Sequence, residues 1–403
     1  MTAKGKKILE TYPLRIWLAS NGAWKAHVPD ATKDRGRRII QANTKEILEN
    51  KIIEDYESKK DNKMLFHNYF AHWLIDYKAL TVQPPTIQRY RDDYNRFLNG
   101  TEIDGMQMGE IKKAKLKTFI HETILKFSLT RKALTNLLTL LRGVFEYALE
   151  EEDIDINPMA GMVINNTNIR AEKLKSSSTE IFNEEELDTL IGYIYEHYKD
   201  NRPVVTLAIL LNFQLGLRVG ELCALRKEDV DYEAKKLTVD RMERSYRPVT
   251  LVNGELVAER TIHTITEGQT KKSSNRSIDL SDEAIMIINE AIRLQESAGI
   301  DSEYLFADDN GEHIIRQRIN DCLRYYCEKV AVDSKSSHKI RKTVLSNLFA
   351  KGFDFEEIMS VAGHRNKQTT YKYHLFSTKV ATERQKRLSN ALSTGHSFGQ
   401  PTR

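Results

Sequence analysis

The segment GHRNKQTTYKY, residues 363–373, is the part of the chain around which its second half is organised. A helix is predicted just before it, because Asp354 and Glu357 have the spacing of a capping box. Two segments further upstream are GLRVGEL, residues 216–222, and SHKIRKT, residues 337–343. The candidate functional groups of the three segments are two guanidinium groups, two imidazoles and a phenol.

The composition of the chain limits the classes of protein to consider. With 403 residues, 40% hydrophobic and 29% charged, it is long enough for two or three domains. The net charge of +4 is small, so a polyanionic partner would have to bind a local cluster of basic residues. The N-terminus lacks the apolar stretch of a signal peptide, and no apolar run approaches the length of a membrane span. We therefore expect a cytoplasmic protein with no membrane partner.

The cysteines, Cys223, Cys322 and Cys327, are odd in number and contain no CxxC pair. This pattern indicates neither a disulfide framework nor a zinc site. We expect reduced thiols, as in a cytoplasmic protein.

Residues 12–57 predict a small three-stranded sheet followed by a helix. Residues 14–19 and 23–28 alternate between apolar and polar side chains around an Asn-Gly turn, and 37–41 form a third candidate strand. Asn43 is a candidate cap for the helix. Basic residues crowd the sheet, among them Lys25, Arg35, Arg37 and Arg38. They form either a solvated charged face or a strand-based contact with a DNA groove, and on this stretch alone both interpretations stand.

Residues 64–160 predict a helical domain. Large apolar residues recur at helical spacing from Phe66 to Tyr77, and again from Leu134 until Asn157 and Pro158 end the pattern. These stripes indicate a hydrophobic core rather than a cofactor site. Residues 165–179 contain almost no large apolar side chain, which marks a domain boundary.

The second half predicts a mixed, mainly helical domain. Asn183 and Glu186 form a capping box, and the apolar helix at 204–215 ends at Gly216. Strands are predicted at 237–239, 249–252, 261–265 and 276–280, with an Asn-Gly turn at 253–254. The fold class is thus multidomain α+β: a small N-terminal three-stranded sheet plus helix, a helical domain, and a mixed, mainly helical domain with a β-hairpin sheet.

The three quoted segments suit chemistry at a phosphodiester. Guanidinium groups bind phosphate bidentately and stabilise the negative charge that grows as a nucleophile adds. Arg218 lies at a helix start with Glu221 three residues on to orient it, and Arg341 follows His338 on one helical face. Either arginine alone would more simply be half of a salt bridge.

Tyr373 is the candidate nucleophile. A phenol, with a pKa of about 10, needs a base or a positive site to attack. His338 or His364 could take its proton, and Lys271 or Lys272, in a turn between strands, could protonate the departing 5′ oxygen. Each group has an ordinary structural explanation, but their order and spacing together favour the chemistry.

With these residues the chain resembles the tyrosine recombinases of the phage-integrase type. The resemblance covers nearly the whole chain and is most specific over residues 180–376. That family's signature is an arginine in Gly-Leu-Arg-x-x-Glu-Leu, a hairpin lysine, His-x-x-Arg, Gly-His, and a tyrosine nine residues beyond that histidine. The matching residues here are Arg218, Lys271 or Lys272, His338, Arg341, His364 and Tyr373. The family spacing favours Tyr373 over Tyr371, and counting back from the following strand favours Lys272 over Lys271. Asp279, where relatives often carry proline, is a departure outside the chemistry.

The resemblance implies a domain plan: an arm-type DNA-binding domain at 1–60, a helical core-binding (SAM-like) domain at 61–164, a linker at 165–180, and a catalytic domain at 181–403. Its C-terminal tail, from about 377, would pack on a neighbouring subunit, or is simply a frayed end. The basic sheet would then contact DNA.

The implied activity is site-specific recombination that integrates and excises a mobile element through a 3′-phosphotyrosine and a Holliday junction. In it Arg218, Arg341 and His364 hold the phosphate, His338 assists proton transfer, and the hairpin lysine is the general acid. We expect a homotetramer on double-stranded DNA attachment sites, with an excisionase or DNA-bending protein as candidate accessory partner. The phosphotyrosine ester stores the bond energy, so no cofactor, ATP or metal is expected. A type IB topoisomerase and a catalytically idle DNA-binding regulator are the alternatives; the N-terminal sheet disfavours the first and the complete residue set the second.

Overall fold

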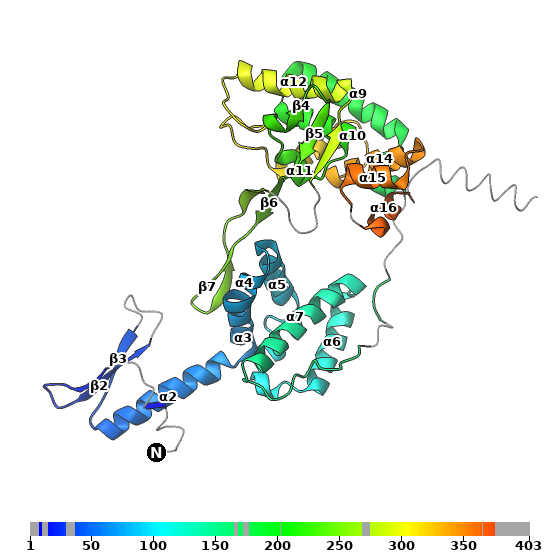
Figure 1. Ribbon diagram of the computed structural model, residues 1–403. Helices are drawn as coiled ribbons and strands as arrows, with labels where there is room; N and C mark the ends of the chain where they lie inside the picture. Colours follow the sequence, from blue (N-terminus) through cyan, green and yellow to red (C-terminus); the bar gives the residue numbers. More distant parts are fainter. Residues whose placement is uncertain are drawn as a thin grey trace, which may run out of the picture. The chain divides into compact units, whose positions relative to one another are not determined.

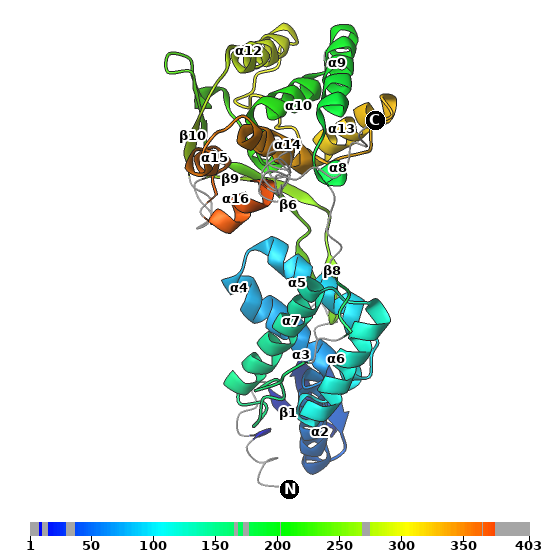
Figure 2. The same ribbon diagram turned by 90° about the vertical axis from the view of Figure 1, so that its right-hand side faces the viewer.

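The computed structural model describes residues 8–9, 15–29, 37–164, 168–171, 177–201, 203–267, 275–364 and 366–374. Arg35, Lys271, Lys272 and the predicted tail from about 377 lie outside these residues. The chain forms two compact units, which Figures 1 and 2 show as ribbons. The first contains residues 1–173 and 246–262, and the second contains 174–245 and 263–403.

The first unit begins with the predicted three-stranded antiparallel sheet, β1 (Ile16–Leu18), β2 (Trp24–Pro29) and β3 (Arg37–Ala42), in that order. The helix α2 (Lys45–Lys63) packs against the sheet, because Leu48 and Ile52 form a small core with Ala26 and Ala42. The cap of this helix is Thr44, whose hydroxyl accepts a hydrogen bond from the Ile47 amide at 3.3 Å, and not Asn43 as predicted. A hydroxyl one position closer to the first turn reaches that amide directly.

A helical core follows in the same unit. Its elements are α3 (Phe66–His72), the π-helix η1 (Trp73–Lys78), α4 (Ala79–Thr81), α5 (Pro84–Phe97), the 3-10 turns η2 (Ile103–Gly105) and η3 (Met108–Glu110), α6 (Lys113–Phe127) and α7 (Arg131–Glu150). Trp73 is fully buried against Gly143 of α7, where a Cβ atom would lie 2.7 Å from the indole. The glycine therefore lets the indole approach the α7 backbone.

A β-hairpin from the second half of the sequence belongs to this first unit. Its strands are β7 (Val249–Val252) and β8 (Glu255–Ala258). The predicted Asn253-Gly254 turn is confirmed, with φ values of 53° and 86° that suit a two-residue hairpin loop. Val249 and Leu256 pack on the helical core, and the Arg247 amide donates to Gln88 Oε1 at 2.9 Å.

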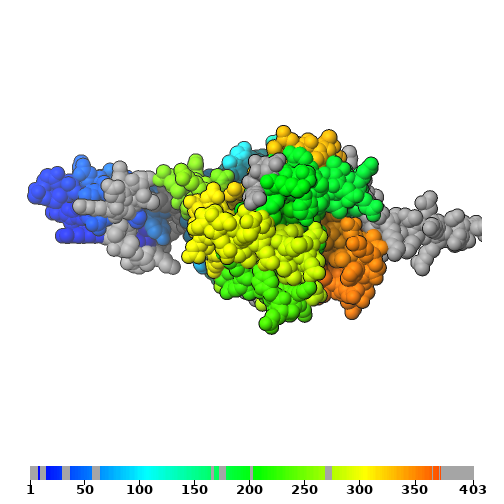
Figure 3. All heavy atoms as spheres, turned by 90° about the horizontal axis from the view of Figure 1, so that it is seen from above, coloured from blue at the N-terminus to red at the C-terminus, as the bar shows by residue number. Residues whose placement is uncertain are grey.

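The second unit surrounds the helix α10 (Val204–Leu215), which is buried on nearly all sides. Its other helices are α8 (Ser177–Glu180), α9 (Glu184–Asn201), α11 (Val219–Cys223), the 3-10 turn η4 (Lys227–Asp229), α12 (Asp282–Ser297), α13 (Arg316–Lys329), α14 (Ser337–Ala350), α15 (Phe355–Ala362) and α16 (Lys367–His374). Its strands are β4 (Val230–Asp231), β5 (Lys236–Val239), β6 (Met242–Tyr246), β9 (Ile262–Thr266) and β10 (Arg276–Asp279). They form a three-stranded sheet in the order β10-β5-β4 and the pair β6-β9, and Figure 3 shows α12 as yellow spheres on the surface of this unit.

The predicted multidomain α+β fold class is confirmed. Both predicted capping boxes of the second unit are present: Asn183 exchanges hydrogen bonds with Glu186, and Asp354 with Glu357. Among the helices described, none combines the length and apolar character that crossing a bilayer requires.

Candidate active site

Arg218 is positioned by the end of a buried helix. Gly216 ends α10 in the left-handed conformation, with φ 61°, and Arg218 is the N-cap residue of α11 two residues later. Its Nη1 donates to Glu221 Oε1 at 2.6 Å, as the spacing predicted, and its backbone amide donates to Glu221 Oε2 at 3.0 Å. About a third of the Arg218 side chain is exposed (34%), so the guanidinium is fixed on one side and accessible on the other.

Arg341 joins the C-terminal ends of two helices. It lies on α14 and is only 1% exposed. Its Nη1 donates to the carbonyl of Gly216, the C-cap of α10, at 2.9 Å. Its Nη2 donates to the carbonyl of Ala362, the last residue of α15, at 2.6 Å. Helix C-terminal carbonyls carry partial negative charge and so favour a cation there. Burial, followed by the charge of Arg218, lowers the pKa of Arg341 to about 10, which still leaves it protonated at neutral pH.

His364 contacts Arg341 directly. Nη2 of Arg341 lies 3.0 Å from His364 Nε2, and His364 Nδ1 lies 2.9 Å from Thr370 Oγ1. Since a guanidinium can only donate, Nε2 accepts, and the ring proton is on Nδ1, where it is donated to Thr370. Burial and the charges of Arg341 and Arg218 lower the pKa of His364 to about 3, so the ring is neutral at physiological pH.

The Tyr373 ring stacks on the His364 ring. The ring centroids are 5.5 Å apart and the planes are inclined by 17°. Tyr373 is 6% exposed and belongs to a small core with Leu345 and Ile358, which joins α14, α15 and α16; Figure 2 shows these helices together. Ser346 of α14 donates to the Tyr373 carbonyl at 3.1 Å. Tyr371, in contrast, is 55% exposed.

Glu221 is the acidic centre of the group. It is 3% exposed and accepts hydrogen bonds from both Arg218 and Arg276. Burial alone would raise the pKa of this carboxyl, but the hydrogen bonds from Arg276 and the charges of Arg276, Arg218 and Arg341 lower it to about 2. Glu221 is therefore ionised at neutral pH.

His338 occupies the first turn of α14, one turn before Arg341. Although the residue is exposed, loss of hydration on the covered side of the ring, and then the charges of Lys342, Arg341 and Lys339, lower its pKa, which favours the neutral form. Lys339 and Lys342 on the same helix are both paired with the buried Glu180 of α8. The Phe182 amide donates to Thr343 Oγ1 at 2.9 Å, which fastens the segment after the predicted linker to this helix.

The described structure thus brings Arg218, Arg341, His364 and Tyr373 into one connected group, with His338 on the same helix as Arg341. Lys271 and Lys272 lie outside the described residues.

The basic residues of the N-terminal sheet separate onto two faces. Lys25 is opposite Gln41 and Arg37 opposite Pro29, whereas Arg38 is opposite the buried Val28. Residues opposite one another share a face, so Arg38 lies on the side that α2 covers, where its Nη2 is 2.7 Å from Asp55 Oδ1. Arg35 lies outside the described residues.

Arg276 was not among the predicted site residues. It is buried at the start of β10, where it accompanies Ile278 on the inner face of the strand. A signal was available in the sequence, since Arg276 is in phase with Ile278 and Leu280 in an alternating strand. An arginine at such a position must have buried acceptors.

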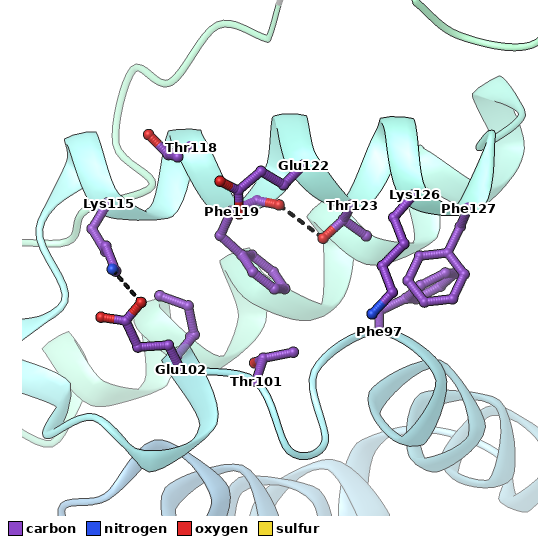
Figure 4. Close-up of a pocket in the computed structure, with 11 residues that line it drawn as sticks. Phe97, Thr101, Glu102, Lys115, Thr118, Phe119, Glu122, Thr123, Lys126 and Phe127 are labelled. Atoms are coloured by element: carbon purple, nitrogen blue, oxygen red, sulfur yellow. Dashed lines mark hydrogen bonds and ion pairs between the residues drawn. The ribbon is translucent and has the colours of Figure 1, made fainter.

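A separate pocket in the first unit has no part in this group. It has a volume of about 210 Å³ between α5, η2 and α6, and includes the Lys115–Glu102 ion pair and three phenylalanines (Figure 4). All its lining residues belong to the helical core of that unit.

Comparison with known proteins agrees with this geometry. Residues 180–378, which contain the whole connected group, match the model of the phage integrase family. The chain belongs to this family. A XerC-like tyrosine recombinase of Caldanaerobacter subterraneus is 28% identical over 306 residues, 73% of this chain and 74% of that protein. The tyrosine recombinase XerC of Thermodesulfovibrio yellowstonii is 25% identical over 72% of this chain and 84% of its own length.

Solved structures of family members share the fold. The Tn1549 transposon integrase in complex with transposon right end DNA has a TM-score of 0.58 and 18% identity, covering 80% of this chain and all of that one. A lambda integrase tetramer bound to a Holliday junction has a TM-score of 0.52 and 15% identity, covering 89% of this chain and 94% of that one. As a phage integrase family member, the protein is a tyrosine-type site-specific recombinase, which confirms the predicted enzyme class.

Proposed function

We propose that the reacting group of this recombinase is Tyr373, which attacks a DNA phosphate to form a 3′-phosphotyrosine and a free 5′ hydroxyl. The observation that carries the proposal is the stack of Tyr373 on His364, whose other edge is hydrogen-bonded to Arg341. A phenol held against a histidine–arginine pair would be close to a phosphate bound by that pair, which supports its role as the nucleophile.

The remaining roles follow from what each group can donate. The accessible side of Arg218 and the N–H groups of Arg341 would hold the non-bridging phosphate oxygens. His364 Nε2 accepts a hydrogen bond from Arg341, so a phosphate oxygen that displaced His364 from this contact would accept the same Arg341 N–H group. His338, whose lowered pKa favours the neutral ring, would accept the Tyr373 proton, and Lys272 or Lys271 would protonate the 5′ oxygen.

The assembly proposed is a homotetramer on two attachment sites, with residues 61–164 and 181–403 as the parts that hold the core DNA and residues 1–60 as the arm-binding part. Lys25 and Arg37, on the face of the small sheet opposite α2, are the proposed arm contacts. Arg38, paired with Asp55, would support the sheet. Integration and excision of a mobile element, helped by an excisionase or a DNA-bending protein, would be the biological reaction, and we propose a tail from about 377 that packs on the neighbouring subunit.

The test compares two neighbouring tyrosines. Full-length wild type, Tyr373→Phe and Tyr371→Phe are incubated with a nicked suicide duplex that carries the candidate element end, and covalent adducts are separated under denaturing conditions. We expect adducts with wild type and Tyr371→Phe and none with Tyr373→Phe, while DNA binding by gel shift is equal in all three. Adducts formed by Tyr373→Phe would refute the assignment.

A further inference from the structure

Arg276 spends three of its N–H groups on two segments that are far apart in the sequence. Its Nη1 and Nη2 donate to Glu221 Oε1 at 3.1 Å and Oε2 at 2.7 Å, and its Nε donates to Val361 O at 2.8 Å. The side chain is 5% exposed, so these bonds are made away from water. A buried bidentate guanidinium–carboxylate pair is geometrically strict, because two parallel hydrogen bonds fix both planes.

The carboxylate that Arg276 holds is the one that holds Arg218. Each Glu221 oxygen accepts two hydrogen bonds: Oε1 from the guanidiniums of Arg218 and Arg276, and Oε2 from Arg276 and the Arg218 backbone amide. Glu221 therefore transmits the position of Arg276 to both the backbone and the side chain of Arg218.

The second contact reaches the other half of the site. Val361 and Ala362 carry consecutive carbonyls at the end of α15, the first accepting from Arg276 and the second from Arg341. Gly363 follows with φ 62°, and a Cβ atom there would lie 3.0 Å from Arg276 Nη1 and 3.2 Å from its Cδ. The backbone that leads into His364 thus rests on the Arg276 side chain.

We infer that Arg276 is a positioning residue for strand cleavage, which aligns Arg218 through Glu221 and His364 through the end of α15. Arg276 is also the first residue of β10, so it ties the strand that follows residues 268–274, where Lys271 and Lys272 lie, to both phosphate-binding elements. In this role Arg276 acts through its protein acceptors, Glu221 and Val361, and not by contact with the DNA. The inference depends on the proposed function, because Arg218 and His364 matter here only as phosphate ligands.

The test replaces the fork by a point charge. Arg276→Lys keeps the charge but cannot make the bidentate bond and the Val361 bond together. Arg241→Lys is the matched control, because Arg241 is another largely buried arginine of this unit. It is paired with Asp229 at 2.6 Å and Glu228 at 2.7 Å, and with none of the site residues that the structure describes. Single-turnover cleavage of the suicide duplex at saturating protein gives the rate constant, and gel shift gives the affinity.

We expect Arg276→Lys to cleave about 10- to 100-fold more slowly than wild type, the loss typical of a misplaced catalytic group, with DNA affinity within about threefold. Arg241→Lys should cleave at the wild-type rate, even if its unfolding temperature is lowered as much as that of Arg276→Lys. In an Arg218→Lys background, where the Glu221 geometry is already lost, the further effect of Arg276→Lys should be clearly smaller. A purely structural role would multiply the two losses.

Three results would overturn the inference: wild-type cleavage by Arg276→Lys, an equal loss in Arg241→Lys, or the same fold loss in both Arg218 backgrounds. If Arg276→Lys does not fold, Glu221→Asp, which withdraws the same carboxylate from the opposite side, must show the loss. The same DNA is first tested with wild type, which should form adducts, and with Tyr373→Phe, which should form none. If that pattern is not observed, the proposed function is refuted, whereas a normal rate in Arg276→Lys would refute only this inference.

Discussion

Two glycines with left-handed backbone conformation determine where the carbonyl groups that accept hydrogen bonds from Arg341 lie. Gly216 and Gly363, with φ 61° and 62°, end α10 and α15, and Arg341 binds Gly216 O and Ala362 O at these two helix ends. Both glycines also meet close neighbours, since a Cβ would lie 3.0 Å from Val344 at Gly216 and 3.0 Å from Arg276 at Gly363. The glycines of the two signature segments are thus required by backbone conformation and by space.

Comparison of Gly363→Ala with Gly352→Ala should separate the requirement for a left-handed backbone from the requirement for space. Gly352 also has a positive φ, 90°, but no atom lies within 4 Å of an added Cβ. Both substitutions should cost about 1 kcal/mol or somewhat more through backbone strain. Only Gly363→Ala, which pushes on Arg276, should slow single-turnover cleavage. Equal cleavage rates for the two variants would contradict the role given to the Arg276 contact.

Glu221 should contribute pH-dependent stability. Its pKa is lowered to about 2 in the folded protein, against an ordinary value near 4.5, so its ionised form stabilises the fold by about 3 kcal/mol. A depressed acid pKa gives stability that is fully present above about pH 4.5 and is lost as the pH falls towards 2. The difference in unfolding free energy between wild type and Glu221→Gln should therefore be constant above about pH 5 and shrink below it.

Denaturant titrations at a series of pH values measure this difference. Glu196→Gln serves as the control, because Glu196 is in an exposed pair with Lys199 and should change stability by less than about 1 kcal/mol at every pH. A wild-type to Glu221→Gln difference that does not depend on pH between 5 and 3 would contradict the lowered pKa.

Among the elements, those with local sequence signals were predictable. The Asn253-Gly254 hairpin turn and the capping boxes at Asn183 and Asp354 depend on a few adjacent residues, and all three are present. The π-helix η1 was not predicted, and the packing of its first residue, Trp73, on Gly143 could not be either, because the two are 70 residues apart. Arg276 was missed as a member of the site for the same reason, since its acceptors Glu221 and Val361 come from distant segments.

The N-terminal sheet gives a prediction that distinguishes its two faces. Lys25→Ala and Arg37→Ala should each weaken duplex DNA binding and reduce the slope of log affinity against log salt concentration by about one, because each removes one phosphate contact. Arg38→Ala should leave the slope unchanged and lower stability by under about 1 kcal/mol, as expected for a partly exposed pair with Asp55. Binding titrations at salt concentrations raised in about twofold steps from about 50 to about 200 mM test this prediction. Identical slopes for all three variants would contradict it.

At the scale of the whole molecule, the chain leaves the second unit at residue 246 and returns at residue 263 after contributing the β7-β8 hairpin to the first. This excursion could not be predicted from sequence, because the strands at 249–258 resemble any other hairpin. Their place is shown by tertiary contacts: Val249 and Leu256 pack on the helical core, and the Arg247 amide is hydrogen-bonded to Gln88. The hairpin should therefore share the local stability of the helices rather than that of β5 and β10.

Hydrogen exchange in Leu137→Ala tests this membership. Leu137 is fully buried in α7, so truncation should cost about 3 kcal/mol in the first unit. Amides of α7 and of the β7-β8 hairpin should then exchange about 100-fold faster, because each 1.4 kcal/mol is a factor of ten. Amides of β5 paired with β10 should be unaffected. Hairpin amides that keep their wild-type protection would place the hairpin outside the cooperative unit of the helices.

The contrast between the two tyrosines of α16 also has a practical consequence. Reagents that nitrate or iodinate phenols act on those that solvent can reach, and Tyr371 is 55% exposed while Tyr373 is 6% exposed. Such a reagent would modify Tyr371 first and spare Tyr373, the proposed nucleophile. A labelled but fully active preparation would thus be the natural outcome, and the nucleophile is better located by sequencing the peptide that remains attached to a cleaved strand.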